Sequence, residues 1–176
     1  MRKEPPVVYL HQNKLLREAL TDIRTFLRES VAIPTKCREL VSGWPDFIGI
    51  KDASGHGVGG IIVGENCACT PTVFRLEWPA DIKADINTQR NPKGRITNSD
   101  LELAGLLLLW LIMEEVCPLT LACHCGLFSD NQPTVHWVKR MASKSSAVAG
   151  QLIRALALRL KLNRVSPLTP MHIKGT

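Results

Sequence analysis

The sequence has 176 residues, which is enough for one ordinary folded domain and a small appendage. Hydrophobic residues make up 45% of the chain and charged residues 22%, and these near-average fractions exclude a fibrous repeat and a disordered chain. The longest nearly uncharged apolar stretch, residues 103–113, is too short to cross a bilayer as a helix, and residues 1–6 lack the apolar core of a secretion signal. We therefore expect an intracellular protein without a membrane segment, in which the six cysteines stay reduced.

The net charge of +6 is unevenly distributed along the chain. Up to Asp130 there are fourteen basic and sixteen acidic residues, a net charge of −2, and no acidic residue follows. The remaining segment holds eight basic residues: Lys139, Arg140, Lys144, Arg154, Arg159, Lys161, Arg164 and Lys174. A one-sided positive field attracts polyanions such as nucleic acid. The alternative is a solvated helix face, and charge alone does not separate the two.

Residues 10–30 carry apolar side chains spaced four, three and four residues apart, which predicts an amphipathic helix. These apolar residues are Leu16, Leu20, Ile23 and Leu27. Two prolines and a glycine then interrupt the chain and predict a linker over residues 31–45. We therefore predict two parts, a helical lead-in with its linker at residues 1–45 and a main domain at residues 46–176.

The main domain begins with three predicted strands, at residues 47–52, 58–63 and 72–78, whose spacing is typical of an antiparallel meander. A polar stretch at residues 79–98 predicts a long loop. From residue 98 or 99 to about 116, the chain is apolar on nearly all faces, which predicts a helix covered by other elements.

A β-like run over residues 119–129 follows, then predicted helices at 132–140 and 145–162 and a last strand at 168–174. The order is three strands, a helix, a strand, helices and a strand. It predicts an α/β fold with a five-stranded mixed sheet and helices packed on it.

Three acidic residues stand where predicted elements begin or end, and each has an ordinary structural explanation. Asp52 enters a glycine-rich turn, where Asp commonly caps the neighbouring backbone. Glu102 lies three residues after Ser99, which fits a capping box. Asp130 lies between a strand and a helix, where it fits an N-cap.

The joint positions of these three residues favour a second interpretation. The ends of adjacent parallel strands and the helix packed on them can meet at one place. Converging carboxylates repel one another unless cations bind between them, and hard oxygen ligands suit Mg²⁺. Two such ions can stabilise the attacking and leaving oxygens of a phosphodiester displacement.

Residues 50–60, Ile-Lys-Asp-Ala-Ser-Gly-His-Gly-Val-Gly-Gly, resemble the first motif of the RNase H-like domain that follows reverse transcriptase in long-terminal-repeat retroelements. Residues 99–104 and 128–131 are similar to the second and third motifs, and residues 171–175 agree with the family's terminal segment. The resemblance covers about residues 46–176. The lead-in before residue 46 resembles the connection between the polymerase and nuclease parts.

The resemblance implies an RNase H-like fold in which Asp52, Glu102 and Asp130 bind Mg²⁺ or Mn²⁺ and the RNA strand of an RNA–DNA hybrid is hydrolysed. In the family a fourth carboxylate normally follows the last strand, and this sequence has none there, so we expect a C-terminally truncated domain. The alternative is a catalytically inactive copy that binds nucleic acid or packs on a reverse transcriptase polymerase domain.

Further side chains are candidates for binding or auxiliary roles. The predicted contacts to nucleic acid are Lys93, Arg95, Lys139, Arg140, Lys144 and Arg154. Ser54 and His172 are candidate auxiliary residues, the histidine for product release or proton transfer, with a structural role as its alternative. Cys67-Ala-Cys69 and Cys123-His-Cys125 lack the usual zinc-ligand spacing, which favours small buried hydrophobes over a zinc site.

Overall fold

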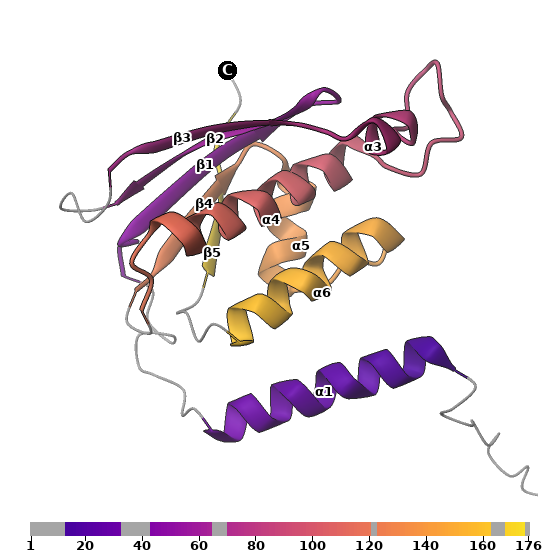
Figure 1. The fold of residues 1–176 in the computed structure, drawn as a ribbon. Helices are drawn as coiled ribbons and strands as arrows, with labels where there is room; N and C mark the ends of the chain where they lie inside the picture. The colour runs from indigo at the N-terminus through magenta and orange to yellow at the C-terminus, as the bar shows by residue number, and fades with distance from the viewer. Residues whose placement is uncertain (1–12, 33–42, 65–69, 121–122, 163–167, 175–176) are drawn as a thin grey trace, which may run out of the picture. The chain divides into compact units, whose positions relative to one another are not determined.

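The computed structural model describes residues 13–32, 43–64, 70–120, 123–162 and 168–174 (Figure 1). The chain forms two compact units, Met1–Lys36 and Cys37–Thr176, a division that falls earlier than the boundary expected at residue 45. In the described ranges, no helix is long and apolar enough to cross a membrane.

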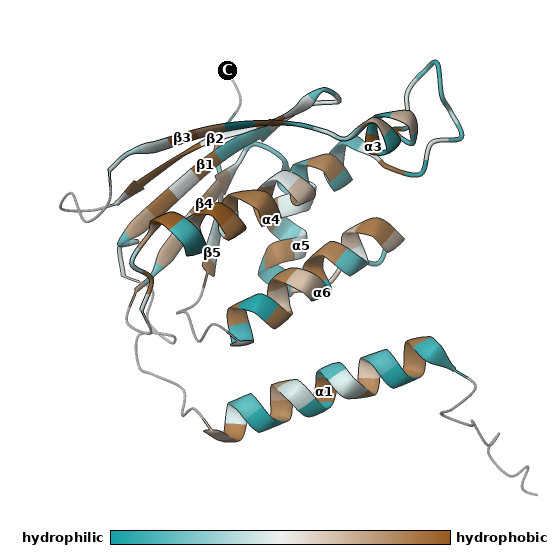
Figure 2. Ribbon diagram, viewed as in Figure 1, coloured by the Kyte–Doolittle hydropathy of each residue, from teal (hydrophilic) through white to brown (hydrophobic). Residues whose placement is uncertain are grey.

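The N-terminal unit contains the helix α1 (Lys14–Ala32), where the sequence predicts a helix over residues 10–30. Asn13 precedes the helix, and its Oδ1 accepts a hydrogen bond from the backbone N–H of Leu16 at 3.0 Å. Hydrophobic and hydrophilic bands alternate along α1 in Figure 2, as the amphipathic pattern requires. The predicted helix is confirmed from residue 14 onward. Residues 10–12 and most of the predicted linker lie outside the described residues.

The second unit is built on a five-stranded sheet with the order β3-β2-β1-β4-β5. Strands β1 (Phe47–Ala53), β2 (Gly57–Gly64) and β3 (Thr72–Glu77) form the predicted antiparallel meander. Strand β4 (Cys125–Ser129) pairs in parallel with β1, and β5 (Leu168–His172) pairs in parallel with β4. The predicted mixed sheet is therefore confirmed.

Helices cover one face of this sheet (Figure 1). The helix α4 (Asn98–Val116) lies against β1 and is largely hydrophobic in Figure 2, with hydrophilic residues toward its ends. Its core residues, each at most 1% exposed, are Leu103, Leu106, Leu109, Trp110 and Met113. The helix α5 (Gln132–Arg140) contacts β4 and β5, and α6 (Ala147–Leu162) packs against α4. The helices predicted from the sequence are confirmed, with α6 beginning two residues later than expected.

Buried and exposed side chains alternate along β1, because successive residues of a strand point to opposite faces. Phe47, Gly49, Lys51 and Ala53 share the helix-covered face, whereas Asp52 is exposed. A Cβ added to Gly49 would lie 2.8 Å from Cδ2 of Leu109, so the missing side chain lets α4 pack closely on the strand. The alternation therefore places Lys51 inside the unit and Asp52 at its surface.

The polar stretch at residues 79–98 is more ordered than the predicted long loop. It contains the helix α3 (Ala80–Ala84) and an isolated bridge between Ile86 and Ile96. Both isoleucines are 8% exposed and join an apolar cluster with Trp78. The prediction of a loop is wrong for residues 80–84, where Ile82 of α3 packs against the same apolar cluster.

Candidate functional site

The three predicted acidic residues stand around the point where β1 and β4 part. The parallel pairing of these strands ends at Ile50 and Phe128. Asp52 and Asp130 each follow that last pair by two residues, and Glu102 projects from the N-terminal part of α4. In open α/β sheets, the crevice at the carboxyl ends of diverging strands is a common place for a ligand.

The carboxylates converge at this point. One oxygen atom from each of Asp52, Glu102 and Asp130 lies within 4.8 Å of the other two. Asp52 and Asp130 are exposed, whereas Glu102 is only 3% exposed. Ligands on opposite sides of a Mg²⁺ ion lie about 4 Å apart, so small side-chain movements would suffice to close these oxygens around one ion.

Other residues form the helix caps that the sequence assigns to Glu102 and Asp130. A capping box starts α4: the backbone N–H of Thr97 donates to Oδ2 of Asp100 at 2.8 Å, and the N–H of Asp100 donates to Oγ1 of Thr97 at 3.3 Å. Asn131 caps α5, where its Oδ1 accepts a backbone N–H at 2.9 Å. The capping explanations for Glu102 and Asp130 are therefore wrong, because other side chains cap the N-termini of α4 and α5.

The turn after β1 is also closed without the carboxylate of Asp52. The backbone N–H of Ser54 donates to the carbonyl oxygen of Gly57 at 2.9 Å, and Nε1 of Trp78 donates to the carbonyl oxygen of Ser54 at 2.7 Å. The hydroxyl of Ser54 accepts the N–H of His56 at 3.3 Å. Within the described residues no backbone group bonds the Asp52 carboxylate, and Ser54 stabilises its own turn.

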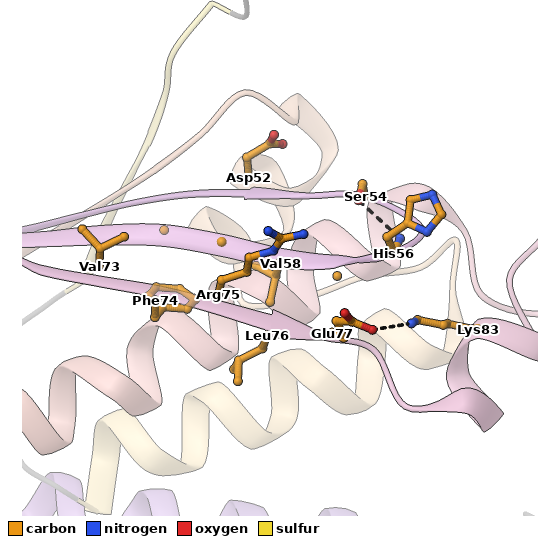
Figure 3. Close-up of a pocket in the computed structure, with 13 residues that line it drawn as sticks. Asp52, Ser54, His56, Val58, Val73, Phe74, Arg75, Leu76, Glu77 and Lys83 are labelled. Carbon is orange, nitrogen blue, oxygen red and sulfur yellow. Dashed lines mark hydrogen bonds and ion pairs between the residues drawn. The ribbon is translucent and has the colours of Figure 1, made fainter.

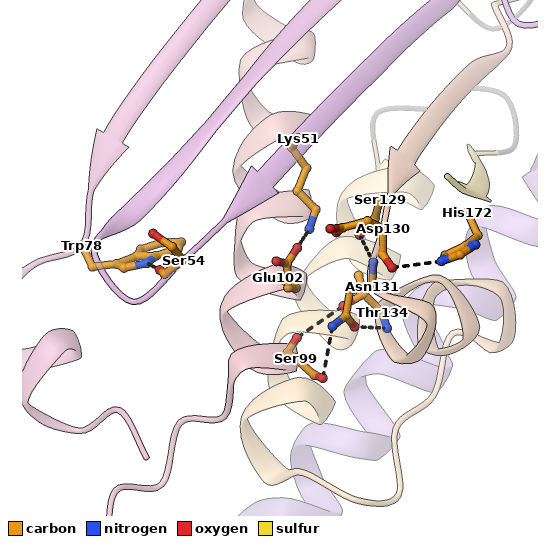
Figure 4. A network of polar contacts seen from close by, with 10 residues as sticks. All are labelled: Lys51, Ser54, Trp78, Ser99, Glu102, Ser129, Asp130, Asn131, Thr134 and His172. Carbon is orange, nitrogen blue, oxygen red and sulfur yellow. Dashed lines mark hydrogen bonds and ion pairs between the residues drawn. The ribbon is translucent and has the colours of Figure 1, made fainter. Parts of the chain in front are cut away.

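His172 and Asn131 fix the backbone on both sides of Asp130 (Figure 4). The ring Nε2 of His172 lies 2.9 Å from the main-chain carbonyl oxygen of Asp130. The N–H of Asn131 donates to Oγ of Ser129 at 3.2 Å, and its Nδ2 donates to Oγ of Ser99 at 3.4 Å. These bonds tie the end of β4 to β5 and to the first turn of α4. The structure thus places His172 next to the backbone of Asp130, where it positions that residue.

A buried lysine that the sequence reasoning missed lies inside the cluster. Lys51 is 3% exposed, and its Nζ forms an ion pair with Oε2 of Glu102 (Figure 4). Burial lowers the pKa of Lys51, while the hydrogen bond to Glu102 and the charges of all three carboxylates oppose that effect. Burial raises the pKa of Glu102, and the bond to Lys51 opposes it in turn. The sequence does contain a signal for this: side chains alternate between the two faces of β1, and residue 51 falls on the face that the helices cover.

Two grooves open beside Asp52. One has a volume of roughly 590 Å³ and is lined by Asp52, Ser54, His56, Arg75 and Lys83 among others. The second, of roughly 570 Å³, runs past Asp52 and Asp130 and reaches Lys174. Arg75 therefore lines one groove and Lys174 the other, while Lys83 is paired with Glu77 in the first groove.

Arg75 lies in the same row of the sheet as Asp52. Asp52 pairs with Gly59 on β2, and Gly59 pairs with Arg75 on β3. Residues paired in this way point to the same face, and Figure 3 shows Asp52 and Arg75 projecting toward the same side of the sheet. Gly59 contributes no side chain, so the row leaves a gap between a carboxylate and a guanidinium. Arg75 was missed because its place depends on the register of three strands.

The basic residues predicted to bind nucleic acid lie elsewhere on the second unit. Arg95 is exposed but already forms an ion pair with Asp85, with Nη2 2.7 Å from Oδ2. The other five are also exposed: Lys93, Lys139, Arg140, Lys144 and Arg154. None of these six lines either of the two grooves beside Asp52. The structure brings the acidic residues together but does not gather these basic residues around them.

The cysteines that the structure describes do not form a metal site. Cys123 and Cys125 are free thiols, and among the described residues only the three carboxylates form a group able to hold a metal ion. Burial raises the pKa of Cys125 to about 12, which fits a small hydrophobe in the core. Cys67 and Cys69 lie outside the described residues.

Comparison with known proteins finds similarity only among solved structures, since no protein-family model and no curated protein matches the sequence. RNase H1 from the halophilic archaeon Halobacterium salinarum NRC-1 aligns with a TM-score of 0.44 and 12% identity, over 73% of this chain and 83% of that one. LC11-RNase H1 in complex with an RNA/DNA hybrid aligns with a TM-score of 0.43 and 12% identity, over 73% of this chain and 85% of that one. At such values a function has to be inferred from the site itself.

Proposed function

We propose that the second unit is a divalent-metal-dependent nuclease of the RNase H type that hydrolyses the RNA strand of an RNA–DNA hybrid. The observation that carries this proposal is the convergence of Asp52, Glu102 and Asp130 within 4.8 Å at the carboxyl ends of two neighbouring parallel strands. Their residue types and order along the chain also match the motifs that resemble retroelement RNase H-like domains.

The donor set fits a single Mg²⁺ or Mn²⁺ ion. All three side chains offer hard oxygen atoms, and two of them are open to solvent. Asp52 and Asp130 would hold the ion, and the oxygen of Glu102 that Lys51 does not occupy would lie beside it. When bound, such an ion supplies Lewis-acid polarisation of a phosphate and a more acidic water molecule.

The chain's own residues would hold and orient the substrate. The grooves beside Asp52 are lined by Arg75 and Lys174, whose charges suit phosphate groups on either side of Asp52. Gly59 lets a sugar–phosphate backbone approach the sheet closely between Asp52 and Arg75. His172 keeps the Asp130 backbone in place.

A second candidate is a module that binds nucleic acid without cleaving it. It is favoured by one observation, the ion pair between Lys51 and Glu102, which places an ammonium group where metal ligands converge. In both cases we propose an origin in a retroelement polyprotein, with residues 1–45 as a helical connection to a polymerase partner. The resemblance of residues 50–60 to the retroelement motif supports that origin.

The test uses the full chain, end-labelled RNA annealed to DNA, and matched RNA and DNA duplexes, with Mg²⁺ or Mn²⁺. A nuclease of this type cleaves only the RNA of the hybrid, and Asp130→Asn abolishes cleavage while Asp81→Asn, an exposed carboxylate on α3, does not. Binding of the hybrid without cleavage would support the second candidate. Absence of both binding and cleavage would reject the two together.

A further inference from the structure

Lys51 is the one feature of the cluster that metal-binding carboxylates alone do not explain. Its side chain is 0% exposed and that of Glu102 is 4% exposed, so the ion pair between them is removed from solvent. An ammonium group is costly to bury without a partner, and this one ends among three carboxylates. Lys51 is therefore held in place by the charge of the cluster.

A glycine of α4 lies beside the aliphatic part of Lys51. Gly105 lies three residues after Glu102, on the same side of α4. A Cβ at Gly105 would lie 2.8 Å from Cγ2 of Val58 and 3.5 Å from Cδ of Lys51. That Cβ would collide with Val58 but would only be in ordinary contact with the lysine stem, so the glycine lets α4 lie close to β2 beside Lys51.

The four charged side chains of the cluster leave a net negative charge. Asp52, Glu102 and Asp130 contribute −3 and Lys51 contributes +1, which leaves −2. That remainder matches the charge of one divalent ion. The oxygen of Glu102 bound by the ammonium group is not free for a metal, and the positive charge of Lys51 repels any metal ion placed beside it.

We propose that Lys51 is a resident cation of the carboxylate cluster, which holds Glu102 and leaves Asp52 and Asp130 as the main ligands of one divalent ion. This inference rests on the metal site of the proposed function and goes beyond it. Lys51 is a positioning residue: it weakens divalent-ion binding, limits it to a single ion, and keeps the cluster partly neutralised when no metal is bound.

The test is titration calorimetry of the full chain with Mn²⁺, comparing the parent with Lys51→Met, which keeps a long apolar stem without the charge. We expect one Mn²⁺ per parent chain and at least about tenfold tighter binding in the variant, since a neighbouring positive charge is worth that much or more at close range. Lys83→Met removes an equal charge from a lysine that is 36% exposed and paired with Glu77, and we expect little change there. Equal affinities in the parent and Lys51→Met would overturn the proposal.

A second variant covers the case in which Lys51→Met does not fold, because Glu102 would be buried without its partner. Lys51→Met with Glu102→Gln removes both charges and keeps the cluster at −2. We expect its Mn²⁺ affinity to stay close to that of the parent, because Asp52 and Asp130 remain. A collapse of binding in this double variant would show Glu102 to be a main ligand, against the proposal.

Cleavage assays on the same proteins separate this inference from the nuclease proposal. If Lys51→Met binds Mn²⁺ more tightly but none of the proteins cleaves the hybrid, the proposed role of Lys51 is supported and the nuclease proposal is rejected. If the parent cleaves the hybrid but Lys51→Met has an unchanged Mn²⁺ affinity, the nuclease proposal is supported and the proposed role of Lys51 is rejected.

Discussion

The substitution Glu102→Gln removes the negative charge from the buried ion pair while keeping the shape of the side chain. Lys51, whose side chain is 0% exposed, would then lose the carboxylate at its Nζ. Breaking a buried pair by removing one partner costs about 3–5 kcal/mol in other proteins, because the remaining charge stays buried. We therefore expect a large fall in the free energy of unfolding.

The protonation of Lys51 sets an upper limit on this fall. Deprotonating a lysine of ordinary pKa 10.5 at pH 7 costs about 5 kcal/mol. Because burial already lowers the pKa of Lys51, losing the proton costs less than this limit. Asp52 and Asp130 also remain near the ammonium group. We expect a loss of about 3 kcal/mol, which corresponds to a drop in Tm of roughly 10 °C for a chain of this length.

The assay is urea unfolding of the full chain at pH 7, followed by circular dichroism without divalent ions. Glu115→Gln is the matched control, because Glu115 is an exposed carboxylate on the same helix, and we expect no measurable change. Adding Lys51→Met to Glu102→Gln should restore most of the stability, since a neutral pair leaves no buried charge. A loss in Glu102→Gln no larger than in Glu115→Gln would refute the buried ion pair.

Three further predictions concern other parts of the second unit. Gly57→Ala should lower the free energy of unfolding by about 2 kcal/mol in the same urea assay, because a Cβ there would lie 2.2 Å from a backbone carbonyl oxygen. Gly59→Ala should lower it far less, because the nearest atom to its Cβ would lie 3.5 Å away. In hybrid-binding titrations at several salt concentrations, Arg75→Ala should reduce the slope of log K against log salt concentration by about 0.9, because one phosphate contact is lost. An equal reduction of the slope in Arg159→Ala, on α6, would argue against a specific phosphate contact at Arg75. Burial raises the pKa of Cys125 to about 12, so iodoacetamide at pH 8 should not alkylate this thiol in the native protein but should do so in urea. Peptide mass spectrometry measures the alkylation, and rapid labelling of the native thiol would contradict its burial.

Local sequence signals fixed most of the fold. The helix over residues 132–140 has the predicted bounds because an asparagine cap precedes it and a proline occupies its first turn. The cap of α4 was misassigned because two overlapping patterns compete. Ser99 with Glu102 and Thr97 with Asp100 both satisfy the capping box, and burial of Asp100 together with its bond from Ser146 decides for the second pair.

The composition of the site was predictable, but its electrostatics were not. The order of Asp52, Glu102 and Asp130 along the chain suffices to bring them together once the sheet is known to be mixed. The roles of Lys51 and Arg75 depend on which face of a strand is covered and on the register of its neighbours. The alternation along β1 indicates the side of residue 51, but its ion pair with Glu102 and the register that places Arg75 are properties of the packed sheet.

The most direct measurement is the rate at which the full chain cleaves the RNA of an end-labelled RNA–DNA hybrid with Mg²⁺ or Mn²⁺, set against the rate for Asp52→Asn. We predict cleavage that stops when the ion is chelated and falls at least about a hundredfold in Asp52→Asn, since removing a metal ligand costs no less than removing the groups that support one. No cleavage by the parent with either ion, or equal cleavage by the parent and Asp52→Asn, would contradict the assignment of the carboxylate cluster as the active site.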